Sequence, residues 1–201
     1  MTGRPARLWL ARHAAPVVAP GLCYGSLDVP ADAQATADAA CRLADALPRA
    51  PLAVSHSPLQ RCAQLAQALQ AARPDLDPRP DARLAEMDFG RWEGLPWSRI
   101  DRSAIDAWTA DFHGHAPGGG ESLAQMMGRV DAALSEVLHG PGGSTGPATT
   151  EVLWITHAGV ARCVRWRLAH PGRLPRADEW PATAPGLGEW DCIDLPWRAG
   201  S

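Results

Sequence analysis

Two histidines and two arginines lie close behind short apolar runs of the chain. Arg12 and His13 follow the first run, Arg61 lies shortly after the second, and His157 comes directly after the third. A neutral imidazole nitrogen can attack phosphorus and form a phosphohistidine that water later cleaves, while guanidinium groups bind phosphoryl oxygens. The sequence therefore predicts a phosphate site with His13 as nucleophile. Arg12 and Arg61 supply the cations of a phosphate cage to which His157 adds a further donor, and the arginine charges lower the pKa of His13.

Cleavage of an ester also needs an acid, because the leaving alkoxide must be protonated. Glu86 is the candidate, since it is flanked by apolar residues and precedes a glycine-containing loop. Asp88, Glu93 and Glu121 are alternatives that spacing alone does not exclude. Judged singly, such residues are more often structural. Together they indicate a site, because ligands of open α/β folds bind beyond the carboxyl ends of the strands.

Apolar runs alternate with helical patterns along the chain. Three runs predict buried strands and a fourth, less regular one predicts an edge strand. Ser57 and Pro58 predict the start of the second helix, because serine can cap a helix and proline has no amide to lose at its first position. This order indicates an α/β fold with three layers, a mostly parallel central sheet flanked by helices on both faces. The predicted strands are 7–11, 51–55, 151–156 and 190–195, the helices cover 31–47, 57–69, 123–138 and 158–169, and 140–150 is an exposed loop.

The composition narrows the classes of function. A chain of 201 residues suits one domain, and its net charge of -3 excludes the broad cationic field that drives nonspecific nucleic-acid binding. All 19 basic residues are arginine, which excludes Schiff-base chemistry on lysine and a P-loop lysine. A small-molecule phosphomonoester is the expected partner, with no nucleic acid and no membrane.

The cysteines indicate the compartment. The chain has five cysteines, an odd number, and they are widely spaced without a CxxC pair. This argues against a disulfide framework and against a zinc site. The sequence also shows no secretory or transmembrane segment. We expect a cytoplasmic protein with reduced thiols, no cofactor and no bound metal.

Four segments, in order, resemble the histidine phosphatase superfamily, which has the phosphoglycerate mutase-like fold. Residues 10–14 (Leu-Ala-Arg-His-Ala) resemble its Arg-His-Gly signature. Residues 57–62 (Ser-Pro-Leu-Gln-Arg-Cys) are similar to its second arginine motif and 156–160 (Thr-His-Ala-Gly-Val) to its second histidine motif. Residues 117–122 (Pro-Gly-Gly-Gly-Glu-Ser) are similar to a segment that opens a late helix. The resemblance covers most of the chain.

The resemblance implies a role for each candidate residue. His13 is the phosphorylated nucleophile, Arg12, Arg61 and His157 form the phosphate pocket, and Glu86 is the proton donor. Two positions depart from the signatures, since Ala14 and Ala158 stand where the superfamily usually has glycine. Each adds a methyl group where backbone can approach phosphate, and the pocket would be reshaped if either position required a positive φ.

A finer resemblance concerns the substrate. Residues 83–94 and 24–30 are similar to the acid loop and the substrate-side loop of the α-ribazole phosphatase branch. This implies that Tyr24 and Ser26 lie on the substrate side. It also implies that the substrate is α-ribazole 5'-phosphate in cobalamin synthesis.

An insertion at 94–120 is expected to cover the site within the single domain of residues 1–201. His113 and His115 lie in it and are candidate substrate contacts. A metal pair is disfavoured there, because no companion ligands lie near. Trp92, Trp97 and Trp108, in and just before the insertion, predict either an aromatic wall for a ring-bearing substrate or simple packing.

Other functions remain open at this point. A phosphoglycerate mutase-type transfer is disfavoured because Arg99 and Arg102 are the only cations between 94 and 120 to hold a second phosphate. A non-catalytic phosphate-binding scaffold would need neither a nucleophile nor an acid. A phosphoprotein phosphatase would need an open, shallow crevice. The sequence is also compatible with a homodimer.

Overall fold

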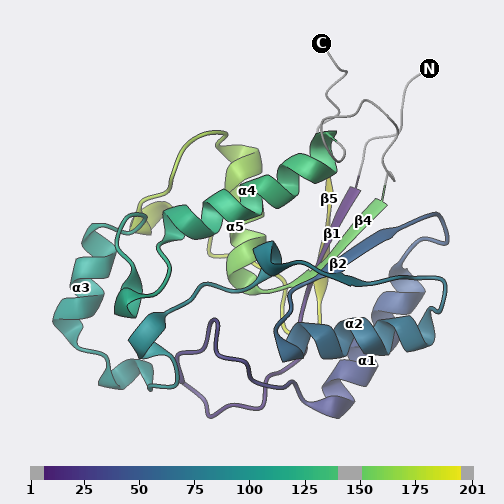
Figure 1. The fold of residues 1–201 in the computed structure, drawn as a ribbon, viewed down its shortest axis with the longest axis horizontal. Coiled ribbons are helices and arrows are strands. Elements are labelled where there is room, and N and C mark those ends of the chain that lie inside the picture. Colours follow the sequence, from purple (N-terminus) through teal and green to yellow (C-terminus); the bar gives the residue numbers. More distant parts are fainter. Residues whose placement is uncertain (1–6, 140–150, 196–201) are drawn as a thin grey trace.

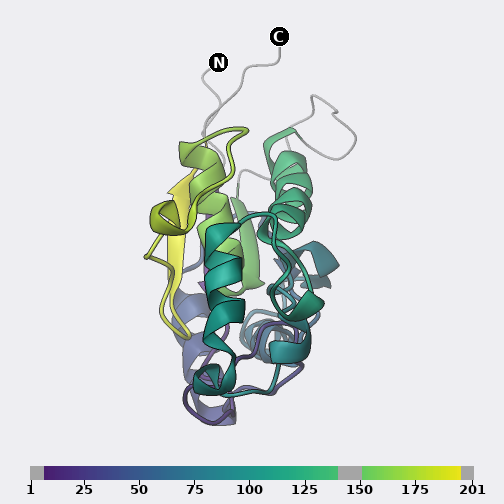
Figure 2. The same cartoon turned by 90° about the vertical axis from the view of Figure 1, so that its left-hand side faces the viewer.

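A computed structural model describes residues 7–139 and 151–195, and its centre is a five-stranded sheet (Figures 1 and 2). The strand order is β3-β2-β4-β1-β5; β3, β2, β4 and β1 run parallel, and β5 pairs antiparallel with β1. The α/β fold with a mostly parallel sheet is therefore confirmed. The predicted loop at 140–150 lies outside the described residues. The strands are β1 (Arg7–Arg12), β2 (Ala53–His56), β3 (Arg79–Pro80), β4 (Glu151–Thr156) and β5 (Trp190–Asp194).

The sheet buries different side chains on its two faces, as alternation along a strand requires. On β4, Val152 and Trp154 pack in a cluster with α4 (Leu123–His139) and α5 (Ala158–Ala169). Leu153 and Ile155 pack in a second cluster with α1 (Ala33–Ala46) and α2 (Gln60–Ala72). Helices thus cover both faces, which gives the three expected layers (Figure 1).

The second helix begins later than the sequence predicted. α2 starts at Gln60, and its first amide is bonded by the carboxylate of Asp28 at 2.7 Å. Because this distant side chain satisfies the helix start, Ser57 does not act as the cap. The prediction that Ser57 and Pro58 begin the helix is therefore wrong. The Ser57 hydroxyl accepts from the amide of Leu59 at 3.3 Å, before the helix begins, and also lies 2.8 Å from Nε2 of His157 in the site described below.

Several short elements carried no sequence signal. Strand β3 has only two residues and extends the parallel sheet beyond β2. Between β3 and α4 lies a long excursion that includes α3 (Arg102–Ala110), drawn at one end of the molecule in Figure 1. The 3-10 turns are η1 (Ala82–Leu84), η2 (Gly90–Trp92), η3 (Trp97–Arg99), η4 (Pro117–Gly119) and η6 (Ala177–Glu179).

Candidate active site

Strand register brings the two predicted histidines together. Arg12 pairs with Thr156 at the last position of the β1–β4 ladder, so the next residues, His13 and His157, leave neighbouring strands at the same level. The amide of His13 donates to the carbonyl of Thr156 at 3.1 Å, and the two imidazole rings lie 5.1 Å apart between centroids. Both histidines are almost fully buried.

His13 has the protonation state that a nucleophile needs. Its Nδ1 lies 2.7 Å from the carbonyl oxygen of Ala14. A carbonyl can only accept, so Nδ1 carries the hydrogen and Nε2 keeps its lone pair. Burial lowers the pKa of His13 to about 3, and the nearby Arg61 and Arg12 charges add to this, while the Ala14 bond opposes it. The ring is neutral near pH 7.

Three guanidinium groups converge on one cavity of about 300 Å³. Arg12, Arg61 and Arg162 line it, and their described hydrogen bonds go only to backbone carbonyls. In each of the three, Nε is buried without a hydrogen-bond partner, which accounts for three of the five such side-chain atoms among the described residues. Buried donors are normally satisfied. An anion bound in this cavity would supply the missing acceptors.

Arg61 is completely buried although it lies on a helix. Its guanidinium donates to the carbonyls of Gly25 and Leu27 and lies 5.5 Å from the ring centroid of Tyr24. These contacts hold the loop that contains Tyr24 against the cavity, which Tyr24 also lines. The structure therefore places this predicted substrate-side residue at the site.

His157 is fixed by two neighbours that the sequence did not identify. Its Nε2 lies 2.8 Å from Oγ of Ser57 and 3.5 Å from Sγ of Cys62. Burial, followed by the charge of Arg61, lowers the pKa of His157 well below its usual value. His157 is thus a neutral group in the wall of the cavity.

Glu86 is the only one of the four candidate acids to line the cavity with His13. Its Oε1 accepts from the amide of Met87 and its Oε2 from the amide of Gly159, each at 3.0 Å. Gly159 lies in the first turn of α5, where amides lack partners within the helix. The carboxyl group is therefore anchored to two different segments.

The three alternative acids have structural partners. Glu93 accepts from the amides of Gly25, Ser26, Leu27 and Phe89. Asp88 accepts from the amide of Gly90 and the hydroxyl of Ser26, and Glu121 pairs with Arg129 at 2.7 Å. Each carboxylate organises the loop around the site instead of facing His13.

Arg162 and Trp97 also line the cavity, and only Trp97 is a candidate from the sequence. The sequence carries no motif that distinguishes Arg162 from the surface arginines that are usual within a helix. A usable signal was its position one turn after Ala158, since helical side chains tilt toward the N-terminus of their helix and so toward the strand ends. Trp97 lines the cavity with an exposed fraction of 39%, whereas Trp92 is buried and packs edge-on against Trp108 at 5.9 Å. Trp97 therefore belongs to the wall of the cavity, whereas Trp92 and Trp108 pack against each other.

The remaining substrate-side candidates lie away from the nucleophile. Ser26 lines an adjoining cavity with Glu86 and Asp88. His113 is exposed and His115 is half-buried, and neither lines the cavity that contains His13. Among the described residues no group of three His, Cys, Asp or Glu side chains could hold a metal ion.

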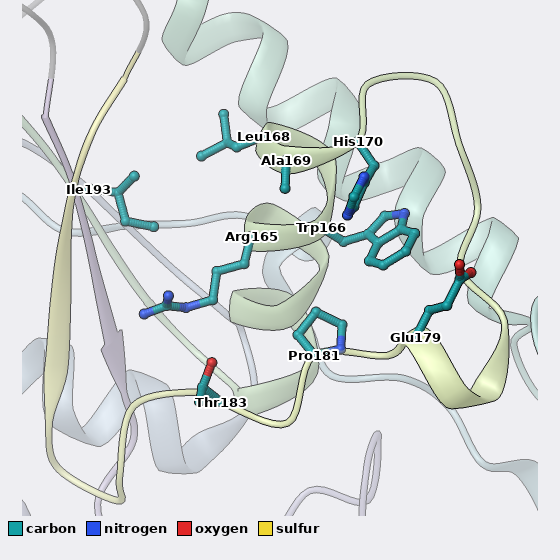
Figure 3. Close-up of a pocket in the computed structure, with 9 residues that line it drawn as sticks. All are labelled: Arg165, Trp166, Leu168, Ala169, His170, Glu179, Pro181, Thr183 and Ile193. Atoms are coloured by element: carbon teal, nitrogen blue, oxygen red, sulfur yellow. The ribbon is translucent and has the colours of Figure 1, made fainter.

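A larger cavity, of about 470 Å³, lies between α5, β5 and the segment at 177–183 (Figure 3). The rings of Trp166 and His170 contact each other there at a tilt of 43°, with centroids 4.2 Å apart, and Arg165 pairs with Asp191. None of the predicted catalytic residues lines it. Its size does not make it the site of chemistry, because the one arginine among its described lining residues is paired with an acid and so forms no phosphate cage.

The two alanines that replace glycine are accommodated without strain. Among the described residues no amino acid other than glycine has a positive φ, so neither Ala14 nor Ala158 needs glycine for its backbone. Both are buried, and Ala158 is the first residue of α5. The backbone around the pocket therefore adopts its conformation without strain although both positions carry a methyl group.

A neutral buried imidazole, arginines that lack acidic partners and an anchored carboxyl group meet where parallel strands end. Such a site is built for phosphoryl transfer from an ester. The described residues include no helix long and apolar enough to cross a membrane.

Comparison with known proteins agrees. The family model of the histidine phosphatase superfamily (branch 1) matches residues 8–183. A glucosyl-3-phosphoglycerate phosphatase of Mycobacterium tuberculosis is 33% identical over 161 residues, which cover 76% of this chain and 69% of the relative. A solved mycobacterial glucosyl-3-phosphoglycerate phosphatase superposes with a TM-score of 0.74 at 28% identity, covering 94% of this chain and 90% of the other. A structure named mycobacterial hydrolase 2 superposes with a TM-score of 0.79 at 29% identity, covering 98% of this chain and 85% of the other.

The chain belongs to the histidine phosphatase superfamily. It is a hydrolase of phosphoric monoesters with the phosphoglycerate mutase-like fold.

Proposed function

We propose that this protein hydrolyses a small-molecule phosphomonoester through a phosphohistidine at His13. The observation that carries the proposal is the free Nε2 of a neutral His13 in a cavity lined by three arginines, each with a buried Nε that has no hydrogen-bond partner. Arg12, Arg61 and the wall formed by His157 bind the phosphoryl oxygens. Their fixed charges and donors stabilise the charge that develops during transfer.

The reaction proceeds in two displacements. Nε2 of His13 attacks phosphorus while the ester P–O bond breaks, and Glu86 gives its proton to the leaving oxygen. The phosphorylated ring keeps its hydrogen on Nδ1, facing the Ala14 carbonyl. Water then attacks the phosphohistidine, the Glu86 carboxylate takes a proton from that water, and inorganic phosphate and free His13 are released.

The substrate is proposed to be small. A cavity of about 300 Å³ lies at the lower end of ligand-pocket volumes, and Trp97 gives it an aromatic rim. The mutase alternative gains no support, since Arg102 pairs with Asp106 and neither Arg99 nor Arg102 lines the cavity. We propose a single domain in which the 94–120 insertion borders the site through Trp97. We also propose that the protein is cytoplasmic, because its five cysteines are free thiols.

The matched relatives do not single out the α-ribazole branch, whose substrate stays a prediction. Turnover of α-ribazole 5'-phosphate and of glucosyl-3-phosphoglycerate, the compound in the name of the mycobacterial relative, should be compared in one panel.

Hydrolysis of p-nitrophenyl phosphate in the presence of EDTA tests the activity. We expect the wild type to release phosphate and His13→Ala to lose at least roughly a thousandfold in rate, because the nucleophile is gone. His170→Ala is the matched control, since His170 is exposed in the other cavity, and it should keep its activity. Substantial turnover by His13→Ala, or complete loss with EDTA, would contradict the proposal.

A further inference from the structure

Gly159 lies against the carboxyl group of Glu86. Its amide donates to Oε2 of Glu86 at 3.0 Å. A Cβ atom built on Gly159 would overlap Oε1 of Glu86 and would lie 3.0 Å from both its carboxyl carbon and Cε of Met126. The space that a side chain would take at this position is occupied by the acid.

The backbone of Gly159 does not itself require glycine. Gly159 is the second residue of α5 and does not belong to the glycines with positive φ. The preceding position carries the side chain of Ala158. Glycine at 159 is therefore explained by the room that Glu86 needs and not by backbone conformation.

We propose that Gly159 is a positioning residue for proton donation, because its amide and its missing side chain together hold the Glu86 carboxyl group at the cavity. This inference rests on the proposed function. In Gly159→Ala the methyl group would displace the carboxyl group from the Gly159 amide. The displaced acid would no longer reach the leaving oxygen.

The leaving group separates positioning from general damage. A p-nitrophenolate leaves without a proton, whereas an alkoxide such as that of glycerol 3-phosphate needs one. We expect Gly159→Ala to lower kcat/KM for glycerol 3-phosphate by roughly a hundredfold, the lower range for loss of a general acid. For p-nitrophenyl phosphate the change should stay below about threefold.

A double-mutant cycle shows whether the effect passes through Glu86. In a Glu86→Ala background, Gly159→Ala should cause no further loss with glycerol 3-phosphate, since no carboxyl group remains to displace. Gly128→Ala is the matched control, because Gly128 is an exposed glycine of helix α4 with no atom within 4 Å of a Cβ, and both its kcat/KM values should stay as in the wild type.

Several results would overturn the proposal. These are equal losses on both esters, unchanged activity on both, or an additive loss in the Glu86→Ala background. A crystal structure of Gly159→Ala decides the positioning independently of turnover, because a carboxyl group still bonded to residue 159 would contradict it. If the wild type hydrolyses neither ester, the proposed function fails, and that structure still tests the contact.

Discussion

At the scale of single residues, Ala14 follows the nucleophile where the superfamily signature has glycine. Its carbonyl fixes the hydrogen on Nδ1 of His13, and its backbone is unstrained. The same holds for the backbone of Ala158 at the start of α5. Neither alanine therefore distorts the pocket.

Restoring glycine should therefore bring no catalytic gain. We expect Ala14→Gly and Ala158→Gly to change kcat/KM by less than about twofold and to lower the free energy of unfolding by about 1 kcal/mol, because glycine gives the unfolded chain more freedom. Steady-state kinetics and urea unfolding measure the two effects. A rise in kcat/KM of tenfold or more would show that the methyl groups obstruct phosphate.

Residue types and strand ends predicted the side chains that the structure brings into one cavity: Arg12, His13, Arg61, Glu86 and His157. For the two arginines and the two histidines, a short motif behind an apolar run fixes which end of the sheet the side chains reach. The signal for Glu86 is different, since it consists of apolar neighbours and a following loop that contains glycine. Arg162 escaped because its role depends on how α5 is turned relative to the cavity. The local sequence predicts the helix start at Ser57, because the carboxylate that bonds the first helical amide, that of Asp28, is distant in sequence.

At the scale of elements, the loop at 24–27 depends on Glu93. One carboxylate accepts the three successive amides of Gly25, Ser26 and Leu27, while Arg61 takes the carbonyls of Gly25 and Leu27. The amides of the loop are thus bonded by an acid, and its carbonyls are bonded by an arginine of the phosphate site. Sequence spacing could not distinguish this anchor from a catalytic acid, because 66 to 68 residues separate the bonded groups.

Removing the anchor should loosen both loop and cage. We expect Glu93→Ala to lower the free energy of unfolding by about 3 kcal/mol, since several amides lose a charged acceptor, and to raise KM because Arg61 loses its fixed position. Urea unfolding and kinetics on p-nitrophenyl phosphate are the measurements. Glu136→Ala, which removes an exposed partner of Arg83, is the control and should cost less than about 1 kcal/mol. Equal effects of the two variants would show that Glu93 is not an anchor.

The long apolar strands were predictable, whereas β3 was not. Runs such as 151–156 are buried on both faces and leave a clear signal. The two residues of β3, Arg79 and Pro80, are exposed and join the sheet only through their pairing with β2. No local pattern distinguishes such a short edge strand from a loop.

At the scale of the whole molecule, two neutral histidines are buried just after the carboxyl ends of β1 and β4. The pKa of His13 falls to about 3 in the folded protein, from 6.5 in an unfolded chain, and that of His157 is also lowered. Below pH 6.5 the unfolded state therefore binds protons that the folded state does not. Stability must decrease as the pH falls from about 6.5 toward 3.

This linkage can be measured by urea unfolding in phosphate-free buffer. Each histidine contributes a slope of up to about 1.4 kcal/mol per pH unit in that window. We expect His13→Gln to remove its share, so that its unfolding free energy depends less steeply on pH than that of the wild type. Identical slopes in the two proteins would mean that folded His13 takes up a proton near the normal pKa.

The central claim is that His13 carries the phosphoryl group, and rapid quenching tests it most directly. The wild type, mixed with a phosphomonoester and quenched in alkali during turnover, should contain a phosphorylated peptide whose modified residue is His13 by mass spectrometry. His13→Ala should contain none. Turnover of the wild type with no phosphohistidine in quenched samples, or with phosphate on another residue, would contradict the account.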